Sequence, residues 1–255
     1  MTGIMGPSIA LAGRALRLPS VVFYDTESAR LTNSWVYRLA SRVVLPDCYE
    51  GDIRSNFTLY AGYQELAYLH PSRFIPDESV LREFGLSPAE PLILLRYVST
   101  AASHDIGQPF LNDSQKTTLV RTFENFGQVR ISSEAPLPEN LEPYRLNGPL
   151  WKVHHLLAFA NLVVGESATM CSESAVLGTP AVYIAQTSRG YLNDLRERYG
   201  LVFTFTPAEF EPALTACVNV LGSTGRADEA RKRLLAEKID VTGWMVEMFE
   251  ADSAI

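Results

Sequence analysis

The chain has 255 residues, enough for one large domain or two smaller ones. Hydrophobic residues make up 47% and charged residues 20%, which is ordinary globular composition and excludes disordered and low-complexity classes. The 22 basic and 29 acidic residues give a formal charge of −7, which argues against a nucleic-acid-binding protein. This balance still allows a local cationic pocket for a phosphate.

The first sixty residues contain two expected strands, 20–24 and 42–45, with a helix at 32–40 between them. From residue 92 onward, apolar runs rich in β-branched residues alternate with helical stretches. The expected strands there are 92–97, 127–132, 161–164, 181–184 and 201–204. The expected helices are 113–125, 151–160, 168–177, 192–199, 207–221 and 227–250.

Strands separated by helices of this length form a parallel sheet covered on both faces. We therefore predict an α/β domain over residues 61–237, with a junction in the Pro- and aromatic-containing sequence 61–77. Two strands are too few for a covered parallel sheet, so we interpret residues 1–60 as part of a second domain.

Three widely spaced cysteines offer neither a disulfide framework nor metal-ligand spacing, so we expect no metal site and a cytoplasmic location. The longest apolar runs, such as 92–95, are too short to cross a bilayer, and a transmembrane protein is not expected.

The stretch 163–180 (VVGESATMCSESAVLGTP) is the richest in candidate chemistry. A buried strand ends at Gly165, the small residues Ser167 and Ala168 follow, and a helix begins near Thr169. Free N–H groups and the positive end of the helix dipole suit a phosphate. Glu173 is placed to hold the two hydroxyls of a ribose. The alternative is a tight strand-to-helix turn with Glu173 as a dipole partner.

Two further candidates follow the ends of other expected strands. Arg96 ends an apolar strand, where a bound diphosphate or an internal salt bridge would compensate its charge. His104 and Asp105 come next and offer an acid–base pair or a loop hydrogen bond. Asp25 and Glu27 follow the strand 20–24 and could act as a base, the alternative being a helix cap at Asp25 or Thr26.

Four long segments, SVVFYDTESAR, YAGYQELAYLHPSRFIPD, LRYVSTAASHDIG and LLAFANLVVGESATMCSESAVLGTPAVYI, resemble an uncharacterised prokaryotic family of GT-B-like proteins. That family is related to the non-hydrolysing UDP-N-acetylglucosamine 2-epimerases. It is also related, more distantly, to the N-acetylglucosaminyl transferase of peptidoglycan synthesis. The resemblance covers roughly residues 6 to 235.

The resemblance implies two Rossmann-like domains facing a cleft. The C-terminal domain, 61–237, would be complete and bind the nucleotide. The N-terminal domain, 1–60, would be truncated and face the sugar and acceptor, and residues 238–255 would return to it as a helix. Glu173 matches a ribose-binding carboxylate and Arg96 a phosphate-binding arginine, and Glu27 falls near a carboxylate facing the sugar. The diphosphate loop is matched by Gly165, Glu166, Ser167, Ala168 and Thr169.

The resemblance implies a GT-B glycosyltransferase of surface glycan or glycolipid synthesis. Its substrate would be a UDP-sugar with no further cofactor, and its acceptor a glycan or a lipid-linked glycan. Glu27 or Asp25 is the candidate base, with His104 a weaker one. Two alternatives remain open: a UDP-sugar 2-epimerase-like enzyme, and a non-catalytic nucleotide-sugar-binding protein with an incomplete N-terminal domain. A homodimer would cover the exposed edge of the sheet.

One departure from the epimerases argues against 2-epimerisation. Where they carry a double glycine and paired glutamates, this sequence has Glu166-Ser167 and Ser172-Glu173.

Overall fold

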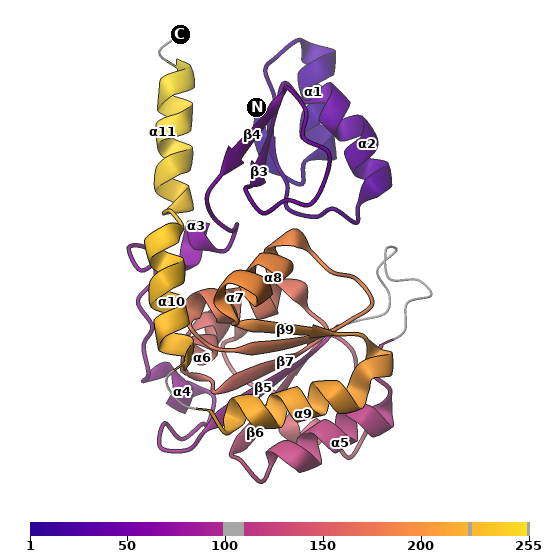
Figure 1. Ribbon diagram of the computed structural model, residues 1–255, viewed down its shortest axis with the longest axis vertical. Coiled ribbons are helices and arrows are strands. Elements are labelled where there is room, and N and C mark those ends of the chain that lie inside the picture. Colours follow the sequence, from indigo (N-terminus) through magenta and orange to yellow (C-terminus); the bar gives the residue numbers. More distant parts are fainter. Residues whose placement is uncertain (99–109, 224–225, 254–255) are drawn as a thin grey trace.

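The computed structural model describes residues 1–98, 110–223 and 226–253, which form two all-parallel sheets (Figure 1). The N-terminal sheet has four strands in the order β1-β2-β3-β4, which are Thr2–Ile4, Val21–Phe23, Arg42–Pro46 and Phe57–Tyr60. Helices α1 (Pro7–Leu16) and α2 (Arg30–Leu39) connect its first three strands.

The expectation of two strands in this region is therefore wrong. Strand β1 has only three residues, two of them exposed, and β4 is mostly half-buried or exposed. Neither strand forms the apolar run by which buried strands are found in a sequence.

The C-terminal sheet has five strands in the order β6-β5-β7-β8-β9. The expected strands of this sheet are confirmed to within one residue. In chain order, β5 to β9 are Leu92–Tyr97, Gln128–Ser133, Leu162–Gly165, Ala181–Ile184 and Val202–Phe205. The helices connecting them are α5 (Asp113–Phe123), α6 (Val153–Phe159), α7 (Ala168–Leu177) and α8 (Gly190–Asp194), and α9 (Phe210–Leu221) follows β9.

Several expected helices are divided in the structure. Short 3₁₀ turns, Leu150–Lys152 and Pro207–Glu209, precede α6 and α9, and another spans Glu142–Tyr144. A π-helical turn, Leu195–Tyr199, follows α8. The single helix expected over 227–250 is two, α10 (Arg226–Glu237) and α11 (Val241–Ser253). They run end to end along one side of both sheets (Figure 1).

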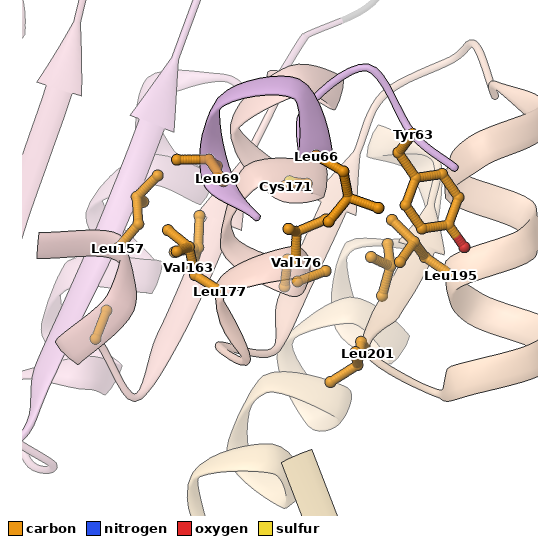
Figure 2. Packing of buried hydrophobic residues seen from close by; sticks show 14 of the residues in the cluster. Tyr63, Leu66, Leu69, Leu157, Val163, Cys171, Val176, Leu177, Leu195 and Leu201 are labelled. Carbon is orange, nitrogen blue, oxygen red and sulfur yellow. The ribbon is translucent and has the colours of Figure 1, made fainter. Parts of the chain in front are cut away.

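The segment that joins the two sheets packs on the C-terminal domain through α3 (Leu66–Leu69), and α4 (Val80–Glu83) follows. Figure 2 shows Leu66 and Leu69 lying over Val163 of β7 and Val176 of α7. Burial of a leucine side chain of this kind contributes roughly 1.5–3 kcal/mol. The same apolar cluster includes Phe23 of β2, so one core spans both sheets.

Helix α11 lies against the N-terminal sheet. Its Trp244 ring packs 5.4 Å from the Tyr60 ring, and its Phe249 ring 6.3 Å from the Phe23 ring, measured between centroids. At the junction of α10 and α11, the Ile239 N–H donates to the carbonyl of Ala61 at 2.9 Å. The C-terminal helix therefore fixes the N-terminal sheet relative to the C-terminal one.

Candidate functional site

The strand order of the C-terminal sheet places a switch point between β5 and β7, since β5 pairs with both β6 and β7. Crossovers leave this point in opposite directions. In open α/β sheets, ligands bind beyond the carboxyl ends of the strands at such a point. Arg96 lies opposite Gly165 in the register, so the residues predicted from the two strands meet here.

Gly165 is required by the approach of two backbones. A Cβ atom added to it would lie 2.1 Å from the carbonyl oxygen of Arg96, closer than any real contact. Glu166 follows, and both of its carboxylate oxygens accept backbone bonds, from Val98 N–H at 3.1 Å and Leu111 N–H at 2.9 Å. Burial raises the pKa of Glu166, and these two hydrogen bonds lower it. Glu166 thus anchors the chain after β5 rather than presenting a free carboxylate.

Helix α7 begins just after the carboxyl end of β7, at this switch point. Ser167 is its N-cap, and its hydroxyl accepts from Met170 N–H at 3.3 Å. Ser167 and Ala168 are half-buried and Thr169 is exposed, so a ligand can reach the first turn, where helical N–H groups have no helical partner.

Glu173 lies one turn further along α7 and is 9% exposed. Its Oε1 accepts from the Tyr68 hydroxyl at 2.9 Å and lies 2.9 Å from Nε2 of His154. The carboxylate is therefore already held by two side chains from outside α7. Its ribose-binding role stays a prediction, and so do the phosphate roles of Gly165, Glu166, Ser167, Ala168 and Thr169.

Arg96 makes the internal ion pair that the sequence left open as an alternative to phosphate binding. Its Nη1 donates to the Ser132 hydroxyl at 2.9 Å, and its Nη2 pairs with Glu134. Its Nε is buried and has no partner among the residues that the structure describes. Phosphate binding by Arg96 stays a prediction.

Asp25 and Glu27 follow β2, at the carboxyl edge of the N-terminal sheet. Glu27 Oε1 accepts from Glu50 N–H and from Gly190 N–H, each at 3.2 Å, and Gly190 begins α8 of the other domain. The Thr26 hydroxyl donates to Asp25 Oδ1 at 2.8 Å. Burial raises the pKa of both carboxyls. These carboxylates therefore face the C-terminal domain.

Glu65 is a buried acid that the sequence reasoning missed. It is 3% exposed and immediately precedes α3. Burial, together with the nearby Asp25 and Glu173 carboxylates, raises the pKa of Glu65 to about 8. The carboxyl is therefore mostly protonated at neutral pH. Glu65 lies in a linker that carries no local signal of a site, and only the packing of α3 brings it near Asp25 and Glu173.

The remaining observations limit the site. His104 and Asp105 lie outside the described residues. Within residues 1–98, 110–223 and 226–253, no group of three His, Cys, Asp or Glu side chains could hold a metal ion. No helix in those ranges is long and apolar enough to span a bilayer.

A groove of about 900 Å³ lies at the opposite edge of the C-terminal sheet, where Asn161, Pro180 and Leu201 precede their strands.

No protein-family model and no curated protein matches the sequence. Solved structures do match the chain in fold. The sucrose-phosphate synthase of Thermosynechococcus elongatus is 14% identical with a TM-score of 0.61, over 96% of this chain and 71% of that one. The UDP-GlcNAc 2-epimerase of Methanocaldococcus jannaschii is 12% identical with a TM-score of 0.61, over 95% and 72%.

A third similar structure is the spinosyn rhamnosyltransferase SpnG complexed with thymidine diphosphate. It is 12% identical with a TM-score of 0.59, over 98% of this chain and 72% of that one. The chain has a GT-B-like fold. Across such structures it spans between 65% and 74% of their own length. At these identities the likeness establishes the GT-B-like fold alone.

Proposed function

We propose that the chain is a nucleotide-sugar-dependent glycosyltransferase of GT-B type, acting in surface glycan or glycolipid synthesis. One observation carries the proposal. The carboxyl edges of the two parallel sheets face each other, and Glu27 of one domain accepts from Gly190 N–H of the other at 3.2 Å. The acids after β2 thereby lie at the same edge of the C-terminal sheet as the start of α7, which suits a diphosphate.

In this proposal the diphosphate of a UDP-sugar lies at the start of α7, where Ser167 to Thr169 supply N–H groups and the positive end of the helix dipole. Glu173 accepts from the ribose hydroxyls. The Arg96 guanidinium would exchange Glu134 for phosphate oxygen, and its buried Nε offers one donor already without a partner.

The transfer step needs a base on the opposite side of the sugar. Asp25 fills that role: burial raises its pKa toward neutrality, which strengthens it as a base. The acceptor hydroxyl oxygen bonds to the anomeric carbon of the sugar while the bond between that carbon and the diphosphate oxygen breaks. The hydroxyl proton goes to Asp25, and the diphosphate leaves with the electron pair, stabilised by the α7 dipole.

A second candidate, a UDP-sugar 2-epimerase-like enzyme, is favoured by Glu65. A buried acid with a pKa of about 8, beside Asp25 and Glu173, can give and take protons during elimination and re-addition of a nucleotide. NMR of the products separates the two reactions, because epimerisation of UDP-N-acetylglucosamine proceeds without an acceptor. Binding without turnover of any tested sugar nucleotide would favour a non-catalytic nucleotide-sugar-binding protein.

Calorimetric titration with UDP, UDP-N-acetylglucosamine and thymidine diphosphate tests the proposal. In the proposed site the Glu173 carboxylate accepts two charge-assisted hydrogen bonds from the ribose hydroxyls. Glu173→Ala removes them, so the affinity for UDP should fall at least about tenfold. Glu139→Ala, on an exposed glutamate, is the control and should bind as the unmodified chain does. Absence of binding by the folded chain, or equal affinity of both variants, would remove the proposed nucleotide site.

A further inference from the structure

A polar pocket of about 560 Å³ lies between the two domains and is not used by the proposed nucleotide site. The N-terminal sheet supplies most of its wall, from the segment after β2, from α2 and from the segment between β3 and β4. The C-terminal domain closes it with Thr187 and Ser188, just before α8. Glu27 belongs to its wall, so the pocket adjoins the proposed reaction site.

Two buried oxygens on residues lining this pocket lack partners. Asn33 is 5% exposed, and its Nδ2 donates to the Thr26 carbonyl at 2.8 Å, which fixes the amide. Its Oδ1, like Oε2 of Glu27, is buried and accepts no hydrogen bond from the described part of the chain. A buried acceptor without a donor costs roughly 1–3 kcal/mol. Because both side chains line the pocket, a donor that reaches these oxygens from it, such as a sugar hydroxyl, would remove that cost.

Two cations line the same pocket. Neither Arg30 nor Arg54 takes part in an ion pair within residues 1–98, 110–223 and 226–253. Arg54 is held with its guanidinium carbon 6.0 Å from the centre of the Tyr37 ring. Of the neighbouring acids, Glu50 is hydrogen-bonded to Asn193 at 2.9 Å, and Asp52 is exposed. A guanidinium fork is suited to a carboxylate or a phosphate.

We infer that this pocket binds a saccharide carrying an anionic group, with sugar hydroxyls donating to Glu27 and Asn33 and the anion bound by Arg30 and Arg54. Its position beside Asp25 and Glu27 makes this saccharide the acceptor. That last assignment rests on the proposed function, whereas the binding itself does not.

Ligand-observed NMR titration of the full chain tests the inference, with D-glucose 6-phosphate, D-glucuronate, D-glucose and inorganic phosphate as probes. Both anionic sugars should bind at least about fivefold tighter than glucose or phosphate alone. A phosphorylated and a carboxylated sugar are both used because a guanidinium fork is suited to either anion. Equal binding of glucose and glucose 6-phosphate, or of phosphate and glucose 6-phosphate, would overturn the inference.

Variants locate the binding. The double variant Arg30→Gln/Arg54→Gln should lower the affinity for glucose 6-phosphate at least tenfold, whereas Arg82→Gln, on an exposed arginine of α4, should leave it unchanged. Asn33→Ala should weaken all three sugars, and the arginine variants decide the matter if it does not fold. Loss of equal size in Arg82→Gln would overturn the inference. UDP calorimetry on the arginine variants should be unchanged, so failure of nucleotide binding and failure of this pocket are separate results.

Discussion

The buried Lys238 gives the sharpest test of how the two domains are held. Its side chain is 1% exposed and lies at the junction of α10 and α11. Its Nζ lies 2.9 Å from Asp47 Oδ1 after β3 and 3.3 Å from Asp194 Oδ2 of α8. The same Nζ is 4.9 Å from the centre of the Tyr63 ring. One ammonium therefore joins both sheets and the segment between them.

Lys238→Met keeps the apolar stem and removes the charge. Removing one partner of a buried ion pair costs about 3–5 kcal/mol, and we take about 3 kcal/mol because Asp47 is 37% exposed and keeps some water. At about 2–4 °C per kcal/mol for a chain of this size, Tm should fall by roughly 6–12 °C.

Differential scanning calorimetry measures this change, and a second variant identifies its cause. Part of the expected cost comes from Asp194, whose side chain is 13% exposed and would keep the Tyr63 hydroxyl and, at 3.6 Å, Arg198 as its partners. Lys238→Met/Asp194→Asn should therefore recover part of the lost stability. A loss below about 1 kcal/mol for Lys238→Met, or no recovery in the double variant, would refute the account of the domain contact.

Three further changes are predicted. Gly190→Ala should lower the free energy of unfolding in chemical denaturation by about 1–3 kcal/mol, because the added Cβ would lie 2.2 Å from the Cys48 carbonyl oxygen. Gly222→Ala, where the nearest atoms lie at 3.5 Å or more, should leave the free energy of unfolding unchanged or raise it. Equal losses in the two variants would contradict this. Glu65 binds a proton more tightly when folded, so its contribution to stability is lost as pH rises from about 4.5 through 8, by at most about 1.4 kcal/mol per pH unit. Glu65→Gln should flatten the Tm–pH profile over that range, and an unchanged slope would exclude this titration. Glu166→Ala removes two hydrogen bonds to a carboxylate and should lower the free energy of unfolding by about 3 kcal/mol in urea; a loss under about 1 kcal/mol would show that they contribute little.

The C-terminal sheet could be predicted because its inner strands β5, β7 and β8 are mainly apolar runs between helices, the pattern of a parallel sheet buried on both faces. Strands β1 and β4 could not, because short, half-exposed strands carry little apolar signal. The break between α10 and α11 was missed for a different reason. Lys238 lies at this break, and its buried ammonium is paired with Asp47 and Asp194, which are distant from it in the sequence.

The candidate site was predictable where it depends on local sequence. The strand end at Gly165 and the N-cap at Ser167 follow from neighbouring residues. Side-chain pairing was not predictable. Nothing near Glu166 in the sequence indicates that its oxygens bind Val98 and Leu111, and nothing in the linker marks Glu65 as an acid near Asp25.

The proposed function requires that a nucleotide diphosphate bind at the start of α7. Titration of UDP into ¹⁵N-labelled chain, followed by backbone amide NMR, tests it most directly. The largest shift changes should fall on the amides of Gly165 to Thr169, and Glu173→Ala should reduce the affinity read from the same amides. Shift changes concentrated at the opposite groove between α9 and α10, or no change at saturating UDP, would contradict it.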